Sequence, residues 1–108
     1  MTKIKITESD EDIVIEMCGH AAYSEPGIDV VCAAVSTLEY IIHAWCKCNA
    51  DKAVLKDRRE DDGYVYMKIV PLSDDVYIVI EAAALGFAAL ADNFSENIFL
   101  NFLKNRER

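Results

Sequence analysis

The hydrophobic pattern of this chain changes its period between residues 18 and 36, and this change constrains the fold more than any other feature. Before it, residues 13–18 alternate between apolar and more polar side chains, which is the pattern of a half-buried strand. After it, Asp29 is followed by apolar residues at spacings of three and four, which predict an amphipathic helix ending near residues 48 and 49. A strand therefore has to pass into a long helix through a short loop.

Two predicted hairpins lie on either side of this helix. Residues 3–7 alternate with lysines on one side, which is typical of an edge strand, and a polar turn at residues 8–12 joins them to the next strand. Residues 52–56 and 64–70 are predicted to pair around a charged connection, in which the Asp-Gly pair at residues 62–63 is the turn signal.

A second helix is predicted after these strands. Ser73 is expected to cap it, and apolar residues recur at helical spacing from Val76 to Leu90. Residues 98–103 predict a last strand, after which the charged tail is expected to fray. The order β-β-α-β-β-α-β predicts an α+β fold with two helices on one side of a mostly antiparallel sheet, as a single domain over residues 1–108.

The second predicted helix is apolar nearly all round, because Glu81 is its only charged residue between residues 76 and 91. A helix covering one side of a small sheet needs only an apolar stripe, and soluble monomers rarely expose large apolar patches. We therefore expect a homodimer with this helix or a neighbouring strand edge in its interface. Cover by the first helix and the terminal segment, or small alanines tolerated at the surface, are the alternatives.

Composition excludes several classes of function. The net charge is −8, with 11 basic and 19 acidic residues and no basic run, which argues against direct nucleic-acid binding but allows a basic protein partner. The chain starts with a strand pattern in place of a signal peptide, so its four cysteines are expected to be reduced thiols of a cytoplasmic protein. The nearly uncharged run at residues 76–91 is shorter than the roughly 20 residues of a membrane span.

Two reactive side chains flank the loop between the strand and the first helix. His20 follows the strand, and Cys32 is the third residue of the helix if Asp29 is its cap. A helix N-terminus favours a thiolate, and a histidine within reach of the sulfur favours it further. The alternatives are that Cys32 is a small buried residue and that His20 only caps the strand end. Cys46 and Cys48 lack the spacing of a zinc site, and no metal is predicted.

Asp29 has two possible roles. As a cap, its carboxylate accepts hydrogen bonds from backbone N–H groups of the first helical turn. As the third member of a triad, it would orient His20. A carboxylate beside Cys32 would raise the pKa of the thiol, so capping is the favoured interpretation.

Further candidate residues surround this pair. Gly19 and Gly27 flank the loop, where they allow tight backbone turns or close approach of a substrate, and Gly27 is a candidate hinge for a loop that orders when substrate binds. Tyr23 in the loop is a candidate substrate contact. Ser36 lies one turn beyond Cys32 on the same helix face and is a second candidate contact.

The combination of Gly-His-Ala with Gly-x-Asp-Val-Val-Cys-Ala-Ala-Val-Ser is far more specific than its parts. It resembles the ribosomal-processing cysteine protease family, known as Prp, and the predicted order of elements agrees over the whole chain. The resemblance rests on Gly19, His20, Ala21, Gly27, Asp29, Val31, Cys32, Ala33 and Ser36.

This resemblance implies a function. The family's catalytic dyad falls on His20 and Cys32, its members are homodimers, and they remove an N-terminal extension from a large-subunit ribosomal protein beside aromatic residues. The implied enzyme is a cysteine endopeptidase that uses no metal or organic cofactor. Backbone N–H groups at the helix start, including that of Cys32, are candidates for the oxyanion hole. The alternative function is a non-catalytic, ribosome-associated module that holds a peptide in the same groove.

Overall fold

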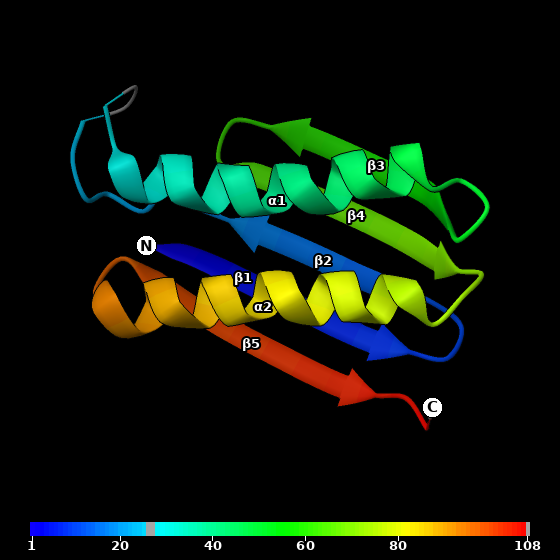
Figure 1. Ribbon diagram of the computed structural model, residues 1–108. Helices are drawn as coiled ribbons and strands as arrows, with labels where there is room; N and C mark the ends of the chain where they lie inside the picture. The colour runs from blue at the N-terminus through cyan, green and yellow to red at the C-terminus, as the bar shows by residue number, and fades with distance from the viewer. Residues whose placement is uncertain (26–27, 108) are drawn as a thin grey trace.

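A computed structural model of the chain describes residues 1–25 and 28–107. Their elements follow the predicted order (Figure 1). The strands and helices are β1 (Thr2–Ser9), β2 (Ile13–Cys18), α1 (Val30–Cys48), β3 (Ala53–Asp61), β4 (Tyr64–Pro71), α2 (Asp75–Asn93) and β5 (Ile98–Asn105).

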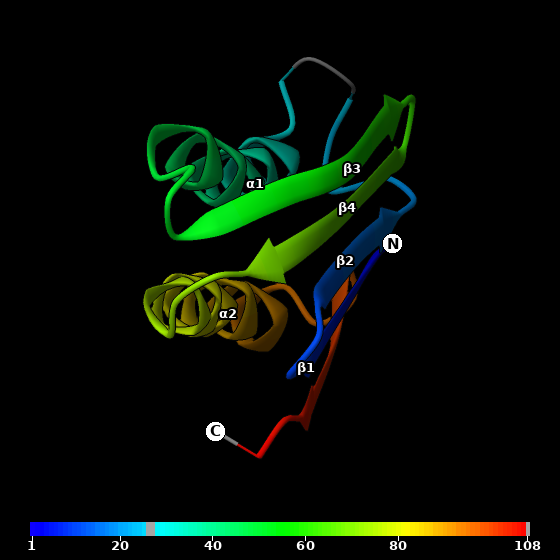
Figure 2. The same cartoon turned by 90° about the vertical axis from the view of Figure 1, so that its right-hand side faces the viewer.

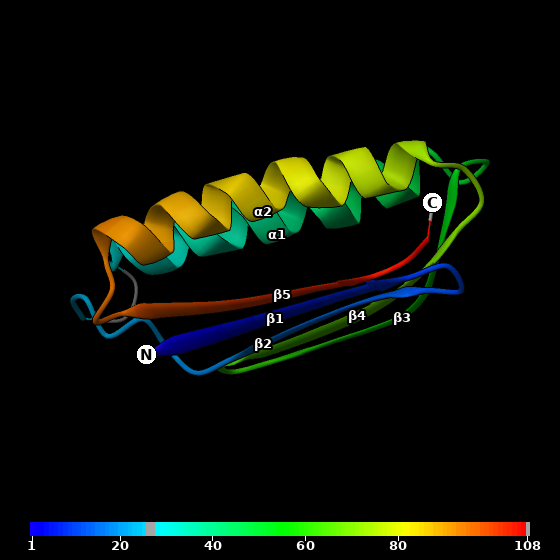
Figure 3. The same cartoon turned by 90° about the horizontal axis from the view of Figure 1, so that it is seen from below.

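The strands form one twisted sheet in the order β3-β4-β2-β1-β5 (Figure 2). The pairs β1–β2, β2–β4 and β3–β4 are antiparallel, and β1–β5 is parallel. Figure 3 shows both helices on the same side of the sheet, with the other side left open. The predicted fold is therefore confirmed.

The core lies between the sheet and the two helices. Alternate residues of the strands face the helices, and α1 and α2 each contribute a buried stripe to this layer. Its largest buried apolar side chains come from both layers: Ile4, Ile6, Ile13, Ile15, Ile42, Met67, Ile69, Tyr77, Ile80 and Phe87. Burial of this apolar surface is the main force that holds the helices on the sheet.

The first strand is not an edge strand, as its pattern predicted. β1 lies between β2 and β5, and its exposed lysines, Lys3 and Lys5, face the open side of the sheet rather than a free edge. Alternation shows that one face is exposed, but it is the same for an edge strand and for an inner strand of a one-sided sheet. β1 also runs on to Ser9, so Glu8, predicted in a turn, is fully buried.

The second hairpin is longer than predicted. β3 continues to Asp61, past a bulge between Leu55 and Asp57, so most of the expected charged connection is strand. Its charges have partners there, because Arg58 binds Glu39 and Glu60. The turn itself is where the Asp-Gly pair predicted it, with Gly63 at a φ of +67°.

Both ends of α2 differ slightly from expectation. The helix starts at Asp75 with Asp74 as the cap residue, whose side chain makes no capping hydrogen bond. Ser73 instead accepts a hydrogen bond at Oγ from the Asp75 N–H, at 3.1 Å. The predicted hydroxyl therefore still serves an N–H of the first turn.

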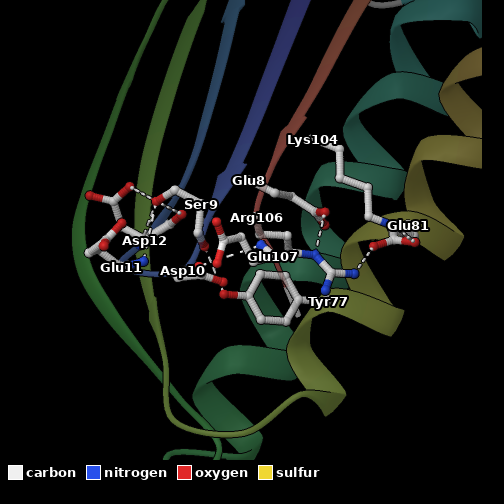
Figure 4. Close-up of polar contacts among 10 residues, drawn as sticks. All are labelled: Glu8, Ser9, Asp10, Glu11, Asp12, Tyr77, Glu81, Lys104, Arg106 and Glu107. Atoms are coloured by element: carbon white, nitrogen blue, oxygen red, sulfur yellow. Dashed lines mark hydrogen bonds and ion pairs between the residues drawn. The ribbon is translucent and has the colours of Figure 1, made fainter.

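The charged tail was predicted to fray, but it is held in place as far as Arg106. Figure 4 shows the Arg106 guanidinium between two carboxylates: Nε donates to Glu8 at 3.0 Å and a terminal nitrogen donates to Glu81 at 2.6 Å. The guanidinium also lies over the Tyr77 ring, 4.1 Å from its centroid. This cluster joins β1, α2 and the end of β5, so it fixes the chain beyond the last strand.

Candidate active site

A cleft of about 240 Å³ opens where the first turns of α1, the end of β2 and the β3–β4 turn meet. These three segments lie at the same end of the molecule, on the left in Figure 1. His20, Cys32 and Ser36 all line this cleft, together with Gly19. The structure thus places both predicted catalytic residues in one cavity.

The position of Cys32 follows from the Asp29 cap. Asp29 has an extended backbone, and its Oδ1 accepts hydrogen bonds from the N–H groups of Val31 and Cys32 at 2.9 and 3.0 Å. Cys32 is consequently the third residue of α1, as predicted, and is half-buried at the cleft. The partial positive charge at the N-terminus of α1 therefore acts on the thiol.

Asp29 also holds the loop that precedes the helix. Its second oxygen, Oδ2, accepts from the N–H groups of Tyr23 and Ser24 at 2.9 and 3.0 Å. Hydrogen bonds from Ser24 and Cys32, followed by those from Tyr23 and Val31, hold the pKa of the Asp29 carboxyl below its usual range. Asp29 is therefore an ionised cap, and both oxygens are occupied by backbone groups.

This arrangement corrects one expectation about catalysis. The Cys32 N–H, predicted as a candidate donor to an oxyanion, is donated to Asp29. The Val31 N–H at the same helix start is committed in the same way. These two donors are not open toward the cleft in this conformation.

His20 lies against the β3–β4 turn. The Gly19 N–H donates to the Gly63 carbonyl at 2.8 Å, and His20 Nε2 lies 3.3 Å from Asp62 Oδ1. Gly19 has a φ of +89°, and a Cβ there would overlap the Met1 carbonyl, so the predicted need for a glycine has a structural cause. The contact with Asp62 was not predicted, because it depends on how distant strands pair.

One wall of the cleft is acidic, and this was not predicted. Glu39, Glu60, Asp61 and Asp62 all line it. Glu39 is buried on α1 and binds Arg58 at 2.7 Å, although its position in the helical pattern gave no sign of this partner. A charged residue on an apolar helix face is the one available signal, since burial of a charge requires a partner.

Other predicted site residues lie outside this cavity or outside the described chain. Tyr23 does not line the cleft; its ring packs edge-on against Phe94, with centroids 5.3 Å apart. Gly27 and the neighbouring Pro26 lie outside the described residues.

The remaining cysteines do not line the cleft. Cys46 is buried in the core, and burial raises its pKa to about 11. Cys18 is half-buried and Cys48 is exposed. Within residues 1–25 and 28–107, no group of three histidine, cysteine or acidic side chains is arranged to bind a metal ion.

Comparison with known proteins decides the family. The model of the family described as "Cysteine protease Prp" matches residues 1–99. The chain belongs to this family. The Prp of Staphylococcus aureus, described as a ribosomal processing cysteine protease, is 27% identical over 108 residues, which cover 94% of this chain and 99% of the relative.

Solved structures place the whole fold among Prp proteins. A crystal structure of S. aureus Prp with a covalently linked product peptide has a TM-score of 0.76 and 25% identity, and covers 94% of this chain and 99% of that one. A protein of Streptococcus mutans has a TM-score of 0.68 and 32% identity, over 97% of this chain and 96% of that one.

Within the described residues, none of the helices is long and apolar enough to cross a membrane.

Proposed function

We propose that this Prp-family protein is a cysteine endopeptidase that removes an N-terminal extension from a large-subunit ribosomal protein, with Cys32 as nucleophile and His20 as acid and base. The observation that carries the proposal is the shared cleft, which brings a helix-start cysteine and a histidine from the end of β2 to one cavity. The likeness to S. aureus Prp, which has been crystallised with a covalently linked product peptide, supports a peptide substrate here.

The proposed reaction has two stages. The Cys32 thiolate attacks the scissile carbonyl carbon, and the His20 imidazolium passes its proton to the leaving nitrogen as the C–N bond breaks. The shortened ribosomal protein leaves, and the extension stays on Cys32 as a thioester. His20 then takes a proton from water, whose oxygen attacks the thioester and releases the extension as a carboxylic acid.

Cleavage of a peptide that spans the extension tests this proposal. We expect Cys32→Ala to abolish product formation in mass spectra, while circular dichroism and melting temperature stay close to the wild type. Cys48→Ser is the matched control, because it removes an exposed thiol far from the cleft in sequence and should cleave normally. Turnover by purified Cys32→Ala would overturn the assignment of the nucleophile.

A non-catalytic peptide-binding module is the second candidate function. It is favoured by one observation: the two helix-start N–H groups nearest Cys32 are occupied by Asp29. Iodoacetamide labelling separates the two functions. A catalytic Cys32 should react fastest of the four cysteines and slow down in His20→Ala, whereas a binding module should label Cys48 first because it is the exposed thiol.

The proposed assembly is a homodimer in the cytoplasm, with one domain over residues 1–108 in each chain and the ribosomal-protein extension as partner. Its support is an exposed apolar stripe on α2 that points away from the sheet. Ile78 and Leu85 are 68% and 74% exposed there, with Ala82 and Ala89 between and beyond them. Soluble monomers seldom leave such a stripe uncovered.

A further inference from the structure

We propose that Asp62 and Gly63, in the β3–β4 turn, are positioning residues that hold the His20 imidazole for catalysis. The inference rests on the proposed dyad and deepens it. It assigns a role to a turn that lies more than forty positions after His20 in the sequence.

Backbone pairing brings the turn to the histidine. Cys18 at the end of β2 pairs with Tyr64 at the start of β4, which pairs in turn with Asp61 at the end of β3. One residue beyond this row, the Gly19 N–H donates to the Gly63 carbonyl at 2.8 Å. The sheet register therefore fixes the turn beside His20 without help from the side chains.

Gly63 leaves the space that the imidazole occupies. A Cβ at this position would lie 3.1 Å from His20 Nε2, and the backbone has a left-handed φ of +67°. A larger residue would have to push the ring or the turn by a few tenths of an ångström. The absence of a side chain thus allows the turn to pack directly against the ring.

Asp62 selects one nitrogen of that ring. Its Oδ1 lies 3.3 Å from Nε2, so this carboxylate favours a proton on Nε2 and leaves Nδ1 as the nitrogen that can serve the thiol. Asp62 is 93% exposed and His20 is 58% exposed, so solvent screens the pair and it adds little to stability. Its consequence is the orientation and tautomer of His20.

Other charged groups at the cleft have different partners. Glu39 on α1 and Glu60 on β3 both bind Arg58. The Asp61 carboxylate accepts a hydrogen bond from the N–H of Asp62. From β4, the Tyr64 hydroxyl donates to Glu16. Asp62 is consequently the carboxylate in contact with His20 among the described residues of this wall.

Steady-state kinetics on Asp62→Asn test the inference, with Asp57→Asn as control. Asp57 lies on β3, the strand that leads into this turn, and carries the same charge, but it binds Arg59 and does not line the cleft. We expect Asp62→Asn to lower kcat roughly three- to tenfold with little change in KM, because a neutral amide oxygen holds the ring less firmly than a carboxylate does.

Gly63→Asn is the second variant. Asparagine tolerates a left-handed backbone, so the turn should fold while its Cβ meets the ring. We expect a fall in kcat with a melting temperature within a few degrees of the wild type. Wild-type kcat in both Asp62→Asn and Gly63→Asn would overturn the inference.

Nitrogen-15 NMR provides a readout that does not need activity. In the wild type, neutral His20 should populate the Nε2–H tautomer almost alone, and in Asp62→Ala the Nδ1–H form should appear. His43, in the C-terminal part of α1, is the internal reference and should not change. If the wild type shows this tautomer but cleaves no peptide, the proposed function has failed and the contact stands. If His20 shows no tautomer preference that depends on Asp62, the inference has failed.

Discussion

At the scale of the residue, two carboxylates show opposite responses to their surroundings. Asp29 is served by four backbone N–H groups, which hold its pKa below the usual range. Glu8 has no exposed surface, and burial raises the pKa of its carboxyl, although Arg106 acts in the other direction. Among the described residues its Oε2 has no hydrogen-bond partner. The ionised Asp29 carboxylate therefore stabilises the fold, whereas the ionised Glu8 carboxylate destabilises it.

Substitution of Asp29 should separate the contributions of its two oxygens to stability. In Asp29→Asn, the amide oxygen can still cap α1, but the amide nitrogen cannot accept from Tyr23 and Ser24. We expect a loss of about 1 kcal/mol in the free energy of unfolding, and about 2 kcal/mol for Asp29→Ala, measured by urea titration. If Asp29→Asn kept full stability but lost activity, the carboxylate would instead have a catalytic role.

The acid titration of Asp29 has a definite sign. Because its folded pKa is lowered, the stabilisation that it provides is present above the unfolded value near 3.8 and is lost as pH falls through the folded pKa. The slope of stability against pH below about 4 should therefore be smaller in Asp29→Asn than in the wild type. Equal slopes in the two proteins would contradict this assignment.

Glu8 should give the opposite sign in a higher window. Because its folded pKa is raised, its contribution is complete below the ordinary value of 4.5 and is lost as pH rises through the folded pKa. Glu8→Gln keeps the oxygen that accepts from Arg106 and removes the buried charge. Its unfolding free energy should fall less between pH 4.5 and 7 than that of the wild type, in chemical denaturation at several pH values. Glu11→Gln, in the exposed turn, is the control.

At the scale of the element, the approach of the two helices depends on Gly86. A Cβ on Gly86 would lie 2.9 Å from both methyl carbons of Leu38, so a side chain there would have to displace the Leu38 side chain between α1 and α2. The helical pattern of α2 was read from its apolar residues, and this glycine was not predicted to matter. Glycine lowers the helix propensity of α2, but it allows α2 to pack closely against α1.

Gly86→Ala should consequently destabilise the protein although alanine is the better helix former. We expect a net loss of about 1 kcal/mol, since the steric cost exceeds the propensity gain of about 1 kcal/mol. In a Leu38→Ala background the same change should become stabilising, because the space is open. A double-mutant cycle in urea measures both terms, and the same sign in both backgrounds would exclude the steric explanation.

At the scale of the whole molecule, the helix layer has an outer surface that one chain does not cover. α1 covers one flank of α2, as predicted by the alternative to a dimer, but Ile78 and Leu85 still face outward. The sheet side carries a different surface, with lysines and tyrosines on its open face. The apolar stripe on α2 is therefore the favoured contact between two copies.

Light scattering at micromolar concentration should give about twice the chain mass of 12.1 kDa. Leu85→Glu should give the monomer mass, because it puts a charge into the proposed interface. Val54→Glu, an exposed apolar residue on β3, is the control and should stay dimeric. A monomer mass for the wild type across a dilution series would refute the dimer and leave the stripe exposed to solvent.

The sequence by itself determined the order of elements and the local geometry around Cys32. Strand alternation, helical spacing and a capping aspartate act between residues a few positions apart, so they specify β2, α1 and the third-residue position of Cys32 without reference to the rest of the fold. The end of β2 at Cys18 likewise places His20 just beyond a strand. These are local interactions, and a single sequence contains their signals.

Only the tertiary structure decided what meets at a distance. Alternation could not show that β1 is an inner strand, because its parallel partner β5 is the last segment of the chain. The contact of Asp62 and Gly63 with His20, the Glu39–Arg58 pair and the anchoring of Arg106 all join residues from separate elements. Their distances depend on strand register and on how the helices cross the sheet, and no short-range pattern encodes either.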